Sequence, residues 1–230
     1  MNDTLLLNAG VVPGNEVRRT SDGFEESFAA SIVGHHILAN RLIEAGLVPD
    51  GARIVIAGSE AANGDLPKMM DAELYDFATG EGTDFGPDLH SAMVNYARAQ
   101  DPSLFSPMRY YAVAKTFVAW SAASMHRRYG ERIQVFTVSP GASMSTNAAR
   151  HQTGFKKFLF TKAMPLLGGI LGMDQPMDVA AKRYVDVLLA RGDFESGRTY
   201  TSAPKKMVGP IQAMKHPHLL DERRQETAWT

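Results

Sequence analysis

The chain of 230 residues contains no cysteine, which excludes disulfide bonds and thiolate metal sites and suits a reducing compartment. It also has little net charge, because 24 lysines and arginines nearly balance 25 aspartates and glutamates. Without an overall positive field, nothing draws the protein to nucleic acid or to anionic lipid. We therefore expect no nucleic-acid partner.

Targeting and membrane-spanning segments are also missing. The first ten residues, MNDTLLLNAG, have no basic segment and only three consecutive leucines, so they do not form a signal peptide. The longest apolar stretch, around Ala163 to Met173, includes paired glycines and Pro165, and it is shorter than the roughly 20 residues that cross a bilayer. We expect a cytoplasmic protein with no membrane span.

The remaining composition, 44% hydrophobic and 21% charged, is that of an ordinary globular protein large enough for one α/β domain. Short apolar runs alternate with longer helical patterns, which predicts a parallel sheet with helices on both faces. The predicted strands are Thr4–Asn8, Arg53–Ala57, Arg132–Ser139 and Arg198–Thr201. The predicted helices run from an Asp22/Glu25 capping box to about Glu44, from Met108 to Tyr129, and near Pro176–Ala190.

Residues 1–203 are expected to form this domain, interrupted by a glycine-rich, acidic insert over residues 62–107. Short helices are predicted in the insert near Met69–Phe77 and Leu89–Ala99. Residues 204–230 are polar and are expected to form a loosely held surface tail.

The first predicted strand, Thr4–Asn8, is fully apolar, as a central strand buried on both faces would be. No earlier strand precedes it, and a bare hydrophobic edge is something natural proteins avoid. This pattern predicts that a segment in front of the strand is missing.

Tyr111 and Lys115 are four residues apart in a predicted helix, so both side chains lie on one face. A phenol titrates near pH 10, and a neighbouring ammonium favours its ionised form, as proton exchange with a carbonyl oxygen requires. Such a pair also arises by chance in an ordinary helix with a surface lysine.

Other polar and flexible residues follow the ends of three predicted strands. Ser59 could hydrogen-bond a substrate oxygen there, or it could be a plain turn serine. Asn8-Ala9-Gly10 and Pro140-Gly141, with Ser145 and Thr146 beyond, are each explained as well by an ordinary strand-to-loop turn.

The order of these features resembles the short-chain dehydrogenase/reductase family over roughly residues 3 to 201. The stretches that carry the resemblance are DTLLLNAGVV, ARIVIAGSEAA, YYAVAK and VSPG. The resemblance implies a Rossmann-type doubly wound α/β fold, and an NAD(P)-dependent oxidoreductase that acts on a carbonyl or alcohol.

The resemblance also implies roles for single residues. Ser59 would hold the substrate oxygen, Tyr111 would be the acid or base, and Lys115 would lower the pKa of Tyr111 and bind the nicotinamide ribose. The remaining implied cofactor contacts are Asn8, Ala9, Gly10, Pro140, Gly141 and one of Ser145 or Thr146.

Two departures from the family pattern matter. Ser31 stands where many members have an asparagine, and no glycine-rich phosphate loop joins a strand to a helix. The first βαβαβ portion therefore looks absent, and with it the residue that selects NAD or NADP. An alternative is a non-catalytic fragment or degenerate homologue unable to hold a dinucleotide.

The long Ser59–Tyr111 spacing resembles the branch with retinol dehydrogenases and protochlorophyllide reductases. Residues 142–175 match the family's substrate loop, and its apolar segment 155–167 is either a lid over a lipophilic substrate or ordinary core or dimer packing. The resemblance also implies pairing of the Ser31 and Tyr111 helices in a homo-oligomer. His35-His36 has no spaced partner for a metal, so none is expected.

Overall fold

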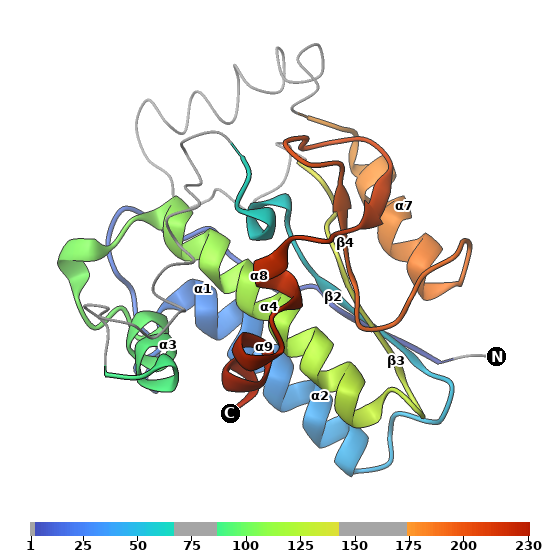
Figure 1. Cartoon of the computed structure of the whole chain (residues 1–230), viewed down its shortest axis with the longest axis horizontal. Coiled ribbons are helices and arrows are strands. Elements are labelled where there is room, and N and C mark those ends of the chain that lie inside the picture. Colours follow the sequence, from blue (N-terminus) through green and yellow to red (C-terminus); the bar gives the residue numbers. More distant parts are fainter. Residues whose placement is uncertain (1–2, 67–86, 143–173) are drawn as a thin grey trace.

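The computed structural model describes residues 3–66, 87–142 and 174–230 and contains a five-stranded sheet in the order β1-β2-β3-β4-β5 (Figure 1). The first four strands are parallel, and β5 is antiparallel to β4. The strands are β1 (Thr4–Leu7), β2 (Arg53–Ala57), β3 (Gln134–Val138), β4 (Thr199–Ser202) and β5 (Ile211–Ala213). The predicted α/β, Rossmann-like sheet is confirmed in this part of the chain.

Helices cover both faces of the sheet, with α2 and α4 on one side and α7 on the other (Figure 1). The helical elements are α1 (Glu26–Phe28), the π-helical η1 (Ala29–Val33), α2 (Gly34–Glu44), the 3₁₀ turn η2 (Glu60–Asn63), α3 (Leu89–Ala97), the 3₁₀ turn η5 (Pro102–Leu104), α4 (Pro107–Tyr129), α7 (Met177–Leu188), α8 (Pro217–Leu220) and α9 (Glu222–Trp229). The sheet is therefore doubly wound.

The two central strands supply both hydrophobic cores, because successive side chains point to opposite faces. Ile54, Ile56 and Val135 pack into the core under α2 and α4. Val55 and Phe136 pack into a second core under α7. The uninterrupted apolar runs of β2 and β3 thus follow from burial on both faces.

The helix that the sequence places from Asp22 begins later, at Glu26, with Glu25 as its N-cap. The Glu25 carboxylate caps α1 by accepting hydrogen bonds from the backbone amides of Ser27 and Phe28, at 2.9 and 3.4 Å. Gly23 precedes it with a φ of +83°, in the left-handed region that favours glycine. The expected glycine past the helix end is confirmed at Gly46, with a φ of +69°.

Strand β1 is an edge strand in the described sheet, and it is not buried on both faces as its composition predicts. Thr4 is exposed and Leu6 is 39% exposed, whereas Leu7 is buried in the core. Among the described residues, β2 pairs with one side of β1 and no strand pairs with the other side.

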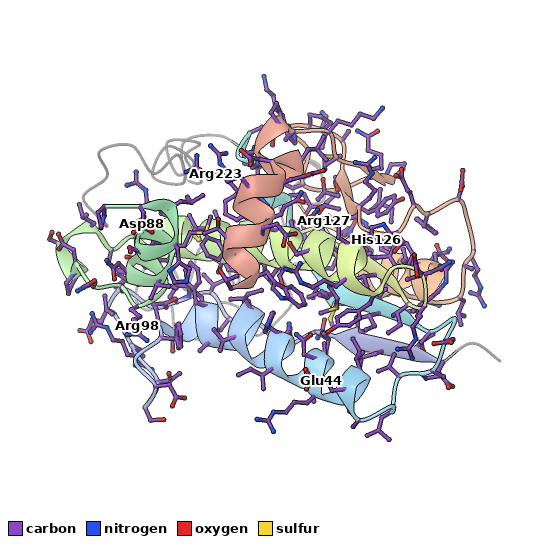
Figure 2. The ribbon with its side chains drawn as sticks, turned by 60° about the horizontal axis from the view of Figure 1, so that its bottom comes forward. Glu44, Asp88, Arg98, His126, Arg127 and Arg223 are labelled. Carbon is purple, nitrogen blue, oxygen red and sulfur yellow. The ribbon has the colours of Figure 1, made fainter. Side chains whose placement is uncertain are left out.

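The C-terminal segment 204–230 is folded, which corrects the expectation of a loosely held tail. It supplies β5, α8 and α9, and it buries Met214 and Leu219. Arg127 on α4 lies beside α9 and donates to Glu226 (Figure 2). The segment looks polar because only one face of each short element is apolar.

In the insert, α3 forms where Leu89–Ala99 was predicted, and the other predicted helix, Met69–Phe77, lies outside the described residues. Over the described ranges, no helix is both long and apolar enough to cross a membrane.

Candidate functional site

Ser59 and Tyr111 come together at the carboxyl ends of the parallel strands. Ser59 follows β2 and is the N-cap of η2, where its hydroxyl accepts a hydrogen bond from the Ala61 amide at 3.2 Å. Tyr111 is in the second turn of α4, close enough to the Ser59 hydroxyl for that group to lower the pKa of its phenol. The predicted hydroxyl and phenol therefore lie near one another.

The pKa of Tyr111 is raised, whereas the Tyr-x-x-x-Lys pattern predicts a lowered one. Burial raises the pKa of its phenol, the Ser59 hydroxyl lowers it, and the charge of Glu60 raises it further. The Lys115 nitrogen lies 5.8 Å from the centre of the Tyr111 ring. In this structure the phenol is thus held protonated, in the form that can donate a proton.

Lys115 is buried on α4 and points to the end of β2. Its ammonium donates a hydrogen bond to the Ala57 carbonyl at 2.8 Å, and burial lowers its pKa to about 8. A buried ammonium with a pKa near neutrality needs polar partners and can lose its proton easily.

Gly10, after β1, leaves room for this lysine. A Cβ at Gly10 would lie 3.2 Å from the Lys115 nitrogen and 3.5 Å from the Ser31 hydroxyl oxygen. That Ser31 oxygen is buried and has no hydrogen-bond partner among the described residues. Lys115 and Ser31 therefore converge on one small space beside Gly10.

The other predicted cofactor residues divide into three groups. Asn8 and Ala9 are exposed beyond the end of β1. Pro140 and Gly141 follow β3 and are partly buried, and Gly141 has a φ of +78°. Ser145 and Thr146 lie outside the described residues, as does the apolar segment 155–167.

Sequence reasoning missed a buried ion pair behind the site. The Arg183 guanidinium on α7 contacts the Glu60 carboxylate at 3.1 Å, and both side chains are buried. Two signals pointed to it. Glu60 directly follows the candidate Ser59, and Arg183 interrupts the apolar stripe of α7 formed by Ala180, Tyr184 and Val187. A charge within an apolar stripe usually has a buried partner.

The histidine pair His35-His36 belongs to α2, and the described residues hold no cluster that could bind a metal ion. His35 is buried, and burial together with the charge of Lys115 lowers its pKa to about 4. His36 lies against Trp229, with the ring centres 4.4 Å apart.

Comparison with known proteins supports the fold of the chain and assigns it no function. No family model and no curated protein matches it. A solved structure of an uncharacterized protein from Mycobacterium paratuberculosis is similar, with a TM-score of 0.61 and 19% identity over 99% of this chain. The chain spans 64% of that protein's length. This likeness supports the Rossmann-like α/β fold and leaves function to the site.

Proposed function

We propose that the chain is an NAD(P)-dependent oxidoreductase of the short-chain dehydrogenase/reductase type, acting on a carbonyl or alcohol of lipophilic character in the cytoplasm. The observation that carries the proposal is the convergence of three side chains at the end of β2: Ser59 directly after the strand, Tyr111 with a phenol whose pKa the Ser59 hydroxyl lowers, and Lys115 one helical turn further along α4, whose buried ammonium donates to the Ala57 carbonyl. This arrangement lies at the carboxyl edge of parallel strands, where α/β sheets bind their ligands.

Each residue of this site would have its own role in carbonyl reduction. The Ser59 hydroxyl would hydrogen-bond the substrate oxygen as negative charge develops on it. Tyr111, whose phenol is protonated at neutral pH and has its pKa raised further by burial, would donate its proton to that oxygen. Lys115 would stabilise the resulting phenolate through its positive charge. In alcohol oxidation the same proton moves in reverse.

The described residues suit the nicotinamide end of the cofactor. Gly10 leaves a space that a Cβ would fill, and the amine of Lys115 and the unpartnered hydroxyl of Ser31 border it. These groups, with Pro140 and Gly141, would hold the nicotinamide and its ribose. When bound, the nicotinamide supplies or accepts the hydride.

The sequence contains no motif that would bind the phosphates of the cofactor. No glycine-rich loop joins a strand to a helix, and the phosphates of a dinucleotide bind at such a loop, so we expect weak NAD(P)H binding by this chain. A non-catalytic homologue that acts through partner contacts is therefore a second candidate, and the missing phosphate loop is the observation that favours it.

Replacing Tyr111 by phenylalanine tests the proposal. Turnover of a panel of aldehydes and ketones would be followed at the highest attainable NADH or NADPH concentration, with affinity measured by fluorescence titration. Tyr111→Phe should lower kcat by about 100-fold or more, because general acid catalysis contributes about that much. Cofactor affinity should stay nearly unchanged.

Tyr110→Phe is the matched control. Tyr110 is the adjacent residue of α4, and its buried hydroxyl has no hydrogen-bond partner in the structure, so removing it should leave turnover intact. Equal turnover by Tyr111→Phe and the unmodified chain would refute the acid role. A folded chain that reduces no carbonyl with either cofactor would favour the non-catalytic candidate.

A further inference from the structure

The Glu60 carboxylate joins the ends of three strands. It follows Ser59 at the end of β2, and one of its oxygens accepts hydrogen bonds from the Ser202 amide and hydroxyl beside β4, at 3.2 and 2.9 Å. Its other oxygen accepts from the Ser139 hydroxyl, just after β3. Glu60 is 4% exposed, so these bonds replace water entirely.

The Arg183 guanidinium completes the connection from the opposite face of the sheet. Besides its ion pair with Glu60, it donates to the Ser139 carbonyl at 3.1 Å, the Ser202 hydroxyl at 2.9 Å and the Gly209 carbonyl at 2.6 Å. The planar guanidinium has donors in a fixed fork, so these contacts fix the positions of their acceptors relative to one another.

The same network reaches both sides of the candidate site. Ser139, which donates to Glu60, accepts a hydrogen bond from the Gly141 amide at 3.1 Å. A Cβ at Gly141 would lie 2.7 Å from an Arg183 nitrogen, so the glycine is needed for this close approach. On the other side, Glu60 begins the η2 turn that is capped by Ser59.

We propose that Glu60 and Arg183 are positioning residues that hold the Ser59 turn and the Pro140–Gly141 turn at a fixed separation. The inference rests on the proposed function, in which these two turns carry the substrate oxygen and the nicotinamide. Both charged side chains form hydrogen bonds to the backbone and hydroxyls around the two turns, so the pair acts through Ser59 and Gly141. A fully bonded buried pair is suited to fixing geometry, because breaking it leaves an uncompensated charge.

The test replaces the pair without leaving a buried charge. Glu60→Met/Arg183→Met removes both charges together, a change that buried ion pairs often tolerate in stability, whereas Glu60→Gln keeps the shape and removes one charge. Lys182→Met is the matched control, since the neighbouring Lys182 on α7 makes an exposed ion pair with Asp186. Amide hydrogen exchange is measured for residues 58–63 and 139–142, with the centre of α4 as the internal reference.

In the folded double variant we expect at least a tenfold loss of exchange protection in both turns and less than a twofold change in α4. Protection of both turns within twofold of the unmodified chain would overturn the proposal. If the double variant does not fold, Glu60→Gln is the deciding variant, with the same two thresholds.

Exchange needs no turnover, so this result stands apart from the test of the oxidoreductase proposal. Where turnover is measurable, kcat should fall at least tenfold in the double variant while KM changes less than threefold. A change in KM alone would contradict a positioning role.

Discussion

Gly10 shows at the scale of one residue how a missing side chain shapes the site. Its backbone needs no left-handed conformation, and what it provides is space beside the Lys115 nitrogen and the Ser31 oxygen. The sequence pattern Asn-Ala-Gly indicated a flexible turn, whereas the structure gives a steric reason for the glycine. A turn glycine and a glycine that provides space should respond differently to substitution by alanine.

Gly10→Ala should displace the Lys115 ammonium without unfolding the protein. The added Cβ would lie 3.2 Å from that nitrogen, which ends a flexible side chain and can move at modest cost. Burial lowers the pKa of Lys115 to about 8, so displacement toward water should raise it toward 10.5. The measurement is an NMR titration of ¹³C-labelled lysine, with the signal assigned by its loss in Lys115→Met.

Gly46→Ala is the contrasting control. Gly46 has a φ of +69° and open space around it, so alanine should cost about 1 kcal/mol of stability and leave the Lys115 pKa unchanged. If Gly10→Ala also left that pKa at about 8, the proposed crowding between Gly10 and Lys115 would be wrong.

Other single residues show what sequence could and could not predict about the site. Ser59 and Tyr111 were found because each lies at a fixed place in a short motif, and the structure brings them near enough for the Ser59 hydroxyl to lower the pKa of the phenol. Glu60 and Arg183 are 123 residues apart in the chain, and only tertiary packing joins them. The pKa of Tyr111 was expected to be lowered, because the sequence gives the neighbouring charge but not the burial that opposes it.

At the scale of elements, the long apolar and periodic segments were the predictable ones. β2 matches its predicted bounds, Arg53–Ala57, and α4 begins one residue before the predicted Met108. The C-terminal elements were missed because α8 and α9 are short and mostly polar, and their apolar residues are buried only by packing against α4, α3 and α2. Short elements of this kind depend on tertiary contacts.

Trp229 is expected to hold α9 against the rest of the fold. Its ring packs on the core, with the His36 ring centre at 4.4 Å and the Arg128 guanidinium 4.6 Å above it. Trp229→Ala should therefore lower the free energy of unfolding by about 2 kcal/mol, less than for a fully buried tryptophan. Urea denaturation followed by circular dichroism measures the change.

Glu222→Gln, on the exposed part of the same helix, should change stability by less than about 0.5 kcal/mol. If Trp229→Ala were equally mild, α9 would contribute little to the fold, and the segment 204–230 would be closer to the loose tail that its composition suggests.

For the molecule as a whole, two histidines predict how stability depends on pH. His35 is buried on α2, and His218 on α8 reaches η2, where its ring nitrogen is 2.9 Å from the Ala62 carbonyl oxygen. Burial is the main cause that lowers the pKa of each imidazole to about 4, and the charge of Lys115 adds to the effect at His35. Both rings are therefore neutral in the folded protein at neutral pH.

The sign of the pH effect follows from the unfolded chain, in which histidine has a pKa near 6.5. Between pH 6.5 and 4 the unfolded state binds protons that the folded state does not, so stability is complete above pH 6.5 and decreases as the pH falls toward 4. For His35 the shift corresponds to about 3 kcal/mol over that range.

His35→Gln should flatten this part of the stability curve, because glutamine has no proton to bind. The difference in unfolding free energy between the unmodified protein and the variant, measured in urea at pH 7 and pH 4.5, isolates the histidine from carboxylates that titrate in the same acid range. His218→Gln should give a second, independent decrease in the pH dependence of the unfolding free energy. The two rings belong to different parts of the fold, and the effects of distant substitutions add. A His35→Gln curve parallel to that of the unmodified protein would mean that His35 takes up its proton in the folded state, which would require water or a polar partner to reach the ring beside Lys115.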